Sequence, residues 1–239
     1  MKLRLSRPNH RKNDNAATHD LHQPASPRTC SPVPWLTSLH TRPGRGPYGI
    51  ASFPGNCSGL LVHDLLSYYR PRNVLDPMTG GGTCRDVCRD LAIPCVSFDI
   101  ADGHDAADPA TFCGRGPFDF VWLHPPYWNL VKYGDDPRCL SQAPTLKEFV
   151  RRLRMVLANC KSVLSPRGRL AVLMGDAKHE GEYLGLPFRT FNAAVAEGLW
   201  LDAPEIIRAS HGASSSRKSY GRSFIPRLHD VCFVFKHRA

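Results

Sequence analysis

The stretch Asp76-Pro77-Met78-Thr79-Gly80-Gly81-Gly82-Thr83 decides the fold of this 239-residue chain. It follows a short apolar segment, residues 73–76, and it opens a helical pattern that runs to Leu91. Glycine lets the backbone turn sharply and come close to a ligand. The first N–H groups of the helix that follows are unpaired and carry a partial positive charge. No Gly-Lys-Ser/Thr sequence follows the turn, which argues against a P-loop for a nucleoside triphosphate.

Apolar segments that fit strands alternate with longer segments that fit helices on both sides of this turn. The predicted strands are residues 73–76, 95–99, 118–123, 169–175, 205–209 and 231–236. The predicted helices are residues 60–69, 80–91 (including the turn), 146–164, which residues 165–168 close, and 188–199. The alternation predicts an α/β fold, with a mostly parallel sheet between two layers of helices. The last two strands have no helix between them, which predicts an antiparallel pair at one edge.

Two polar segments end predicted strands, where ligands bind in open α/β sheets. Asp99 ends the second strand, and its carboxylate could accept hydrogen bonds from ribose hydroxyls or cap a turn. His124-Pro125-Pro126-Tyr127 ends the apolar strand 118–123. Two prolines fix the backbone and remove two N–H donors, so the preceding carbonyls are left for an external donor. The arrangement suits a planar heterocycle that bears an amino group, and the alternative is a rigid turn with aromatic rings in the core.

Together, the segments at 76–83 and 124–127 resemble the S-adenosylmethionine-dependent DNA amino-methyltransferases, which modify adenine N6 or cytosine N4. Phe53-Pro54-Gly55 resembles the N-terminal cofactor motif of that family, and Asp99 stands at the position of its ribose-binding acid. Residues 224–230, followed by an apolar strand, resemble its closing segment. The resemblance covers roughly residues 47–239, and the order of the motifs is that of the class without a large recognition domain between them.

The resemblance implies a Rossmann-like methyltransferase fold with a mostly parallel seven-stranded sheet, helices on both faces and an antiparallel edge strand. It implies S-adenosyl-L-methionine as the cofactor, DNA as the partner, and a target base flipped out of the duplex. The residues that it assigns to the cofactor are Phe53, Pro54, Gly55, Asp76, Pro77, Gly80, Gly82, Thr83 and Asp99. The residues that it assigns to catalysis are His124, Pro125, Pro126 and Tyr127. Tyr127 would stack on the base, while the Pro125 carbonyl and the side chain at position 124 would accept hydrogen bonds from its amino group.

His124 departs from the family pattern, which usually has Asp, Asn or Ser at this position. A neutral imidazole can accept one hydrogen bond and an imidazolium none, and the ordinary pKa of histidine lies near neutrality. An active enzyme, a shifted target and a catalytically inactive DNA-binding member of the fold all stay open. RNA and protein-amide amino-methyltransferases carry similar Pro-Pro-Tyr motifs, but residues 53–55 and the closing segment favour DNA. We expect an active DNA methyltransferase, with the choice between adenine and cytosine left open.

The net charge of +10 is unevenly distributed along the chain. Residues 1–46 carry +6, are rich in Pro, Arg, His, Asn and Ser, and contain few aliphatic residues. This composition predicts a disordered basic extension before one methyltransferase domain, residues 47–239. The stretch 208–227 contains five Lys/Arg residues, from Arg208 to Arg227, and His211 but no acid, which suits phosphate contacts, although a solvated loop is the alternative. The predicted DNA contacts are Lys132, Arg217, Lys218 and Arg222, and Lys132 and Tyr133 could line the entrance of the base pocket.

Nine cysteines are spread along the chain without a Cys-x-x-Cys pair. This spacing argues against a zinc site, and we expect ordinary reduced thiols and no metal. No apolar run is long enough to cross a bilayer, and no apolar stretch follows the basic N-terminus. The sequence therefore predicts a soluble, cytoplasmic protein without a membrane partner, and it leaves the oligomeric state open.

Overall fold

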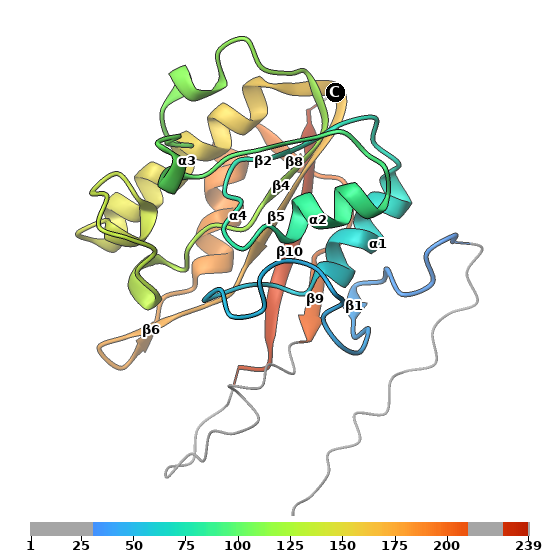
Figure 1. The fold of residues 1–239 in the computed structure, drawn as a ribbon. Coiled ribbons are helices and arrows are strands. Elements are labelled where there is room, and N and C mark those ends of the chain that lie inside the picture. Colours follow the sequence, from blue (N-terminus) through green and yellow to red (C-terminus); the bar gives the residue numbers. More distant parts are fainter. Residues whose placement is uncertain (1–30, 210–226, 239) are drawn as a thin grey trace, which may run out of the picture. The chain divides into compact units, whose positions relative to one another are not determined.

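A computed structural model of the chain describes residues 31–209 and 227–238. Their centre is an eight-stranded sheet in the order β1-β9-β10-β5-β4-β2-β3, with β8 paired to β10 (Figure 1). The pairs β2–β3, β2–β4, β4–β5 and β1–β9 are parallel, and β10 is antiparallel to each of its neighbours. The prediction of a mostly parallel sheet with an antiparallel strand toward one edge is confirmed. β1 and β8 are not among the strands predicted from the apolar segments, and the sheet has eight strands rather than the seven that the resemblance implies.

The strands of this sheet differ widely in length. They are β1 (Leu39–His40), β2 (Val74–Asp76), β3 (Cys95–Ser97), β4 (Phe118–Leu123), β5 (Leu164–Met174), β8 (Leu199–Leu201), β9 (Ile206–Ala209) and β10 (His229–His237). A separate hairpin consists of β6 (Lys178–His179) and β7 (Glu182–Tyr183). Within the described residues, no helix is long and apolar enough to cross a membrane.

Helices cover both faces of the sheet, as predicted. One face carries α1 (Gly59–Tyr69) and α2 (Thr83–Asp90), and the other carries α3 (Leu146–Ser162) and α4 (Leu186–Ala196) (Figure 1). Successive residues of β4 point to opposite faces: Phe120 and Trp122 pack in the core under α1 and α2, while Val121 and Leu123 pack in the core under α3 and α4. β4 is therefore buried on both faces from Phe120 to Leu123, which explains the apolar sequence of that part, whereas Asp119 near its amino end is partly exposed and pairs with Arg72.

The helix starts depend on side chains that are visible in the sequence. Ser58 precedes α1, and its hydroxyl accepts a hydrogen bond from the backbone N–H of Leu60. Thr145 precedes α3 and accepts from the backbone N–H of Glu148 at 3.1 Å. Such caps satisfy N–H groups that have no partner inside the helix. The observed starts of α1 and α3 lie within one residue of the predicted ones for this reason.

Three predicted boundaries are wrong. The composition of residues 31–46 predicts disorder, but Leu39 and His40 form β1, where the buried His40 imidazole contacts the Asp64 carboxylate of α1 at 3.0 Å. Residues 165–168 resemble a closing turn, but they lie inside β5, where a register shift opposite β4 accommodates them. The last helix ends at Ala196 rather than at residue 199, because Leu199 pairs with β10 as the start of β8.

The core on the α3 side should contribute measurably to stability. Leu153 is fully buried in α3, whereas Met155, two residues later, is 38% exposed. We expect Leu153→Ala to lower the free energy of unfolding by about 2–5 kcal/mol, because it leaves a cavity among close-packed side chains. Met155→Ala is the matched control and should change it by less than about 0.5 kcal/mol. Denaturant unfolding followed by circular dichroism measures both, and equal effects would contradict the described packing.

Candidate active site

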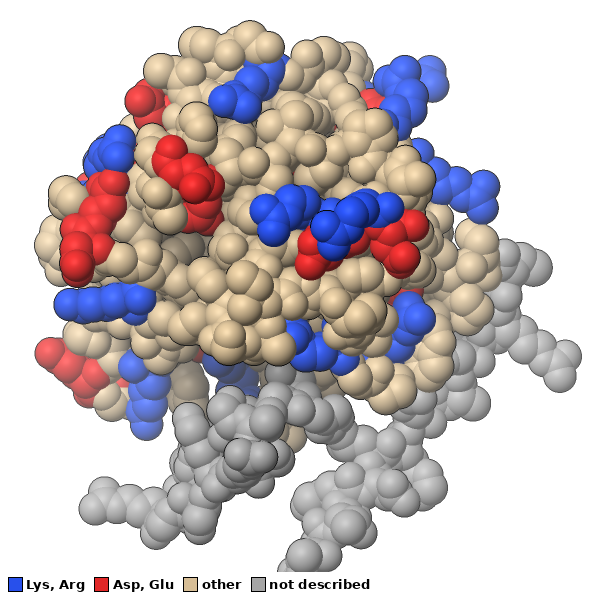
Figure 2. All heavy atoms as spheres, viewed as in Figure 1, with Lys and Arg blue, Asp and Glu red and all other residues tan. Residues whose placement is uncertain are grey.

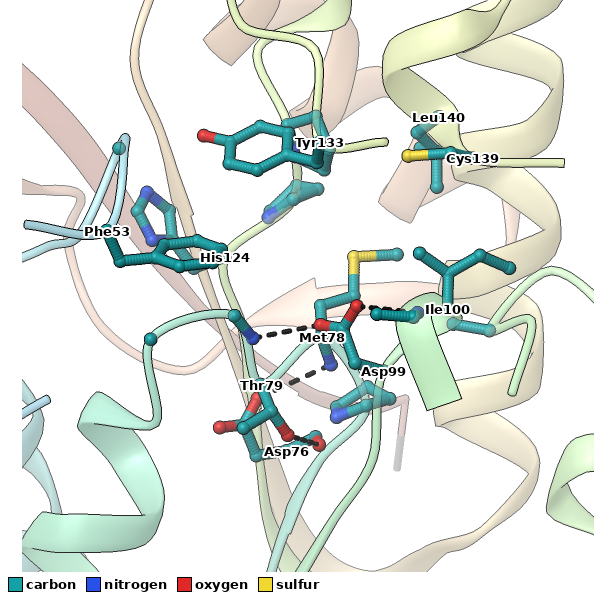
Figure 3. A pocket seen from close by; sticks show the side chains of 18 of the residues that line it. Phe53, Asp76, Met78, Thr79, Asp99, Ile100, His124, Tyr133, Cys139 and Leu140 are labelled. Carbon is teal, nitrogen blue, oxygen red and sulfur yellow. Dashed lines mark hydrogen bonds between the residues drawn. The ribbon is translucent and has the colours of Figure 1, made fainter. Parts of the chain in front are cut away.

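A cavity of about 370 Å³ lies at the carboxyl ends of β2, β3 and β4 (Figure 3). This volume lies in the range of sites for small organic ligands. The structure brings four separate segments of the sequence to its wall. The predicted cofactor and catalytic residues that line it are Phe53, Pro54, Gly55, Asp76, Pro77, Gly80, Thr83, Asp99, His124, Pro125, Pro126 and Tyr127. Gly82 is the one residue of those two predicted sets that does not line the cavity.

Asp99 is held in place by backbone amides. Its carboxylate oxygens accept hydrogen bonds from the N–H groups of Gly80 at 2.9 Å and Ala101 at 3.1 Å. The second bond caps a short 3₁₀ helix, η1 (Ile100–Asp102). Asp99 therefore does cap a turn, which was one of its two predicted roles. The same carboxylate also lines the cavity, so capping fixes its orientation toward any ligand there.

Asp76 is a buried carboxylate with few hydrogen bonds to replace its lost hydration. Its side chain is 2% exposed and accepts one long hydrogen bond, from the backbone N–H of Met78 at 3.4 Å. Burial raises the pKa of Asp76 well above its usual value, because a carboxylate loses its hydration there. A cationic group in the cavity would reverse this penalty by pairing with the charged form.

His124 and Tyr127 form a hydrogen-bonded pair on the opposite wall. The His124 Nε2 atom lies 3.0 Å from the Tyr127 hydroxyl, and the two rings meet edge to face. Burial lowers the pKa of His124 to about 4, because the protein around the ring disfavours the charged imidazolium. The imidazole is therefore neutral at pH 7, and a neutral imidazole has one nitrogen that accepts a hydrogen bond.

An ion pair lies behind the Tyr127 ring. Arg208 of β9 binds the carboxylate of Asp230 in β10, and both side chains are largely buried. A methyl group on Gly175 would come within 2.4 Å of both Asp230 and Tyr127, so these side chains fill the space beside that glycine. This placement corrects the sequence interpretation of the basic stretch 208–227, because Arg208 is an internal partner of Asp230 rather than a free surface cation.

The loop after the Pro-Pro-Tyr segment supplies the outer wall. The Tyr133 ring stacks on Phe53, with ring centroids 5.8 Å apart and planes inclined by 20° (Figure 3). Tyr133 lines the cavity as anticipated, whereas Lys132 is exposed and does not line it. Other lining residues were not singled out from the sequence, namely Met78, Ile100, His104, Arg138, Cys139 and Leu140. Met78 lies inside the stretch 76–83 but was given no role, and the others belong to no short motif.

The predicted nucleic-acid contacts are mostly beyond the structure. Arg217, Lys218 and Arg222 lie outside the described residues. On the face of the described residues that Figure 2 shows, basic and acidic side chains are interspersed. Several of the exposed cations pair with acids, as Arg151 does with Glu148 at 2.7 Å. The electrostatic part of the DNA prediction therefore depends on segments that the structure does not describe, together with Lys132.

The sequence matches no protein-family model and no curated protein. Among solved structures, TrmN from Thermus thermophilus aligns with 17% identity and a TM-score of 0.46 over 77% of this chain. A glycopeptide N-methyltransferase, MtfA, in complex with S-adenosyl-L-methionine aligns with 14% identity and a TM-score of 0.46 over 84% of this chain and 92% of its own length. A second Thermus thermophilus protein, provisionally described as a DNA modification methylase and solved with S-adenosyl-L-methionine, aligns with 18% identity and a TM-score of 0.41 over 56% of this chain.

This chain spans 50% of the length of TrmN and 54% of the length of the second Thermus thermophilus protein. At these identities, the assignment of an activity has to depend on the residues of this chain.

The buried Asp76 carboxylate should cost stability when the cavity holds no cation. Its pKa in the folded protein is raised above the usual 3.8, so the folded state keeps a proton that the unfolded chain has released. The free energy of unfolding therefore falls as the pH rises above 3.8 toward the pKa of the folded protein. We expect Asp76→Asn to be more stable than the native protein at pH 7 and to lose this advantage toward pH 4.

Denaturant unfolding at several pH values tests this expectation. Asp102→Asn is the control, because Asp102 is exposed in η1 and its substitution should leave the pH dependence unchanged. If the native protein were more stable than Asp76→Asn at pH 7 without added ligand, other groups of the protein would have to stabilise the charged carboxylate.

Proposed function

We propose that this chain is an S-adenosyl-L-methionine-dependent methyltransferase that acts on the exocyclic amino group of a flipped DNA base, adenine N6 or cytosine N4. One observation carries the proposal. A single cavity is lined at one end by the glycine turn with Asp76 and Asp99, and at the other by residues 124–127. A methyl donor and an amino acceptor can therefore meet inside it, which is the positioning that a transfer between two bound molecules requires.

The cofactor end fits the proposed group in shape and charge. Gly80 has a left-handed backbone with φ of 47°, and an added methyl group would lie 2.9 Å from the Phe53 ring. A side chain at position 80 would therefore fill the space beside the turn. S-adenosyl-L-methionine carries a cationic ammonium and a sulfonium, and it supplies an electrophilic methyl group when bound. Asp76 offers the cation a buried carboxylate, and Asp99 offers the ribose hydroxyls acceptor oxygens with a fixed orientation.

The acceptor end fits an amino group on a flat ring. In the tautomer whose Nε2–H donates to the Tyr127 hydroxyl, the His124 Nδ1 atom remains an acceptor, so it and the Pro125 carbonyl can accept hydrogen bonds from the two N–H bonds of the amino group. Accepting both bonds turns the nitrogen lone pair toward the methyl donor. Tyr127 can stack on the ring, and its hydroxyl stays protonated because burial raises its pKa well above 10. These residues bind and orient, and no covalent enzyme intermediate is needed.

The neutral His124 favours an active enzyme over an inactive DNA-binding protein of the same fold. A protonated His124 could not hold the amino group, because an imidazolium cannot accept a hydrogen bond. A pKa of about 4 removes that obstacle at physiological pH. The resemblance at residues 53–55 and in the closing segment favours DNA over RNA or a protein amide. The closing segment ends at Asp230, whose carboxylate lies beside Tyr127.

Methyl transfer from labelled S-adenosyl-L-methionine tests the proposal. Purified protein is supplied in parallel with plasmid DNA, tRNA and a protein extract, and modified nucleosides in digested DNA are identified by mass spectrometry. We expect N6-methyladenine or N4-methylcytosine. Tyr127→Ala should lower the rate by about 10²-fold or more through loss of base positioning, while Tyr68→Ala, on the exposed side of α1, should leave it unchanged. Label that enters only tRNA or protein would overturn the DNA assignment, and cofactor binding without any transfer would support the inactive alternative.

The pH profile of kcat/KM should report the low pKa of His124. Measured for DNA at saturating S-adenosyl-L-methionine, this parameter follows the titration of the enzyme–cofactor complex, in which the bound cation keeps Asp76 charged. We expect activity to be constant through pH 6.5 and to fall only toward pH 4, as the imidazole is protonated and stops accepting. His124→Asn keeps an acceptor that does not titrate, so it should retain activity and lose the decline toward pH 4. A midpoint near 6.5 in the native enzyme would mean that the ring is hydrated rather than buried.

A further inference from the structure

Three cysteines converge beneath the cofactor end of the cavity, although their spacing in the sequence does not resemble a zinc motif. Cys84 and Cys88 lie four residues apart on α2, and residues four apart share one face of a helix. Cys95 begins β3, which lies beside β2 in the sheet. The three sulfur atoms all lie within 4.8 Å of one another. Tertiary packing, rather than a local motif, brings them together.

We propose that Cys84, Cys88 and Cys95 form a three-thiolate site for a thiophilic d¹⁰ cation such as Zn²⁺. Zinc binds thiolate sulfur at about 2.3 Å, which places tetrahedral sulfur ligands on the order of 3.8 Å apart. Sulfur atoms already within 4.8 Å of one another need side-chain adjustments of the order of an ångström to reach that geometry. Soft thiolate ligands select zinc and copper(I) over hard cations such as Mg²⁺.

The surroundings of the cluster allow an ion to enter and to be held. Cys84 and Cys88 are buried, while Cys95 is partly exposed, and Cys84 also lines the cavity described above. The site is thus accessible from two sides. Three protein ligands leave a fourth coordination position, which water or a small thiol can fill.

Coordination would involve no redox step. Each of the three thiols loses its proton to solvent, and three sulfur–metal bonds form. The bound ion would connect the first two turns of α2 to β3, directly below the turn at residues 80–82. Because the ligands are together only in the folded chain, the ion should stabilise the folded state. The inference does not depend on the proposed methyl transfer, so either can fail alone.

Cadmium binding to the full-length reduced protein tests the site directly. Cd²⁺ reports thiolate coordination through its ultraviolet charge-transfer absorption. We expect one Cd²⁺ per chain, displacement by Zn²⁺, and a higher thermal unfolding midpoint with equimolar Zn²⁺. Cys88→Ala and Cys95→Ser should each weaken binding by more than about tenfold, since even the loss of a partner behind a ligand costs that much. Cys113→Ser is the control, because Cys113 is an exposed thiol outside the cluster.

A second measurement keeps the test decisive if a variant fails to fold. Native protein is alkylated with and without Zn²⁺, and the modified cysteines are identified by peptide mapping. Zn²⁺ should slow the alkylation of Cys95, the partly exposed member of the cluster, and leave Cys113 unaffected. Absence of stoichiometric binding by the native protein would overturn the proposal. Protection confined to Cys113, or unchanged affinity in both cluster variants, would do so as well.

Discussion

The burial of β4 on both faces is the constraint on which the rest of the structure depends. Residues 120–123 pack alternately under α1 and α2 and under α3 and α4, so no polar side chain can be placed in this part of the strand without a cost in free energy. The polar groups are therefore displaced to the carboxyl end, where the strand stops at Leu123. The Pro-Pro-Tyr segment begins there and faces the ends of β2 and β3. The position of the cavity is thus a consequence of how the central strands are buried.

Loss of hydration affects the charged form of a different residue type on each wall of the cavity. On one wall, the Asp76 carboxylate is buried with a single long hydrogen bond, which is unfavourable until a cation arrives. On the other wall, the half-buried His124 imidazole is kept neutral by loss of hydration, which preserves a hydrogen-bond acceptor. The same physical effect, loss of hydration, therefore raises one pKa and lowers the other. A site that binds a cation at one end and an amino group at the other benefits from both shifts.

The main strands, the four helices and the cavity-lining motifs could be predicted because each has a local cause. Phe118–Leu123 is apolar apart from Asp119 and is followed by His124-Pro125-Pro126, and Thr145 is a typical N-cap. Features that depend on distant partners could not be predicted. β1 exists because it pairs with β9 and His40 contacts Asp64. Arg208 belongs to a basic stretch in the sequence, yet its partner Asp230 lies 22 residues away across a strand pair. The approach of Cys95 to α2 is equally invisible in the spacing of cysteines.

Gly175 also limits which substitutions this protein can accept during evolution. In the sequence it is an ordinary glycine after an apolar strand, and it does not line the cavity. In the folded chain, its missing side chain is the space that the Tyr127 ring and the Asp230 carboxylate occupy. Even the smallest replacement, alanine, therefore requires one of them to move. In a relative with any other residue at this position, we expect the side chains around Tyr127 to be arranged differently. Position 175 could therefore distinguish homologues by the geometry of the site even when their motif residues are identical.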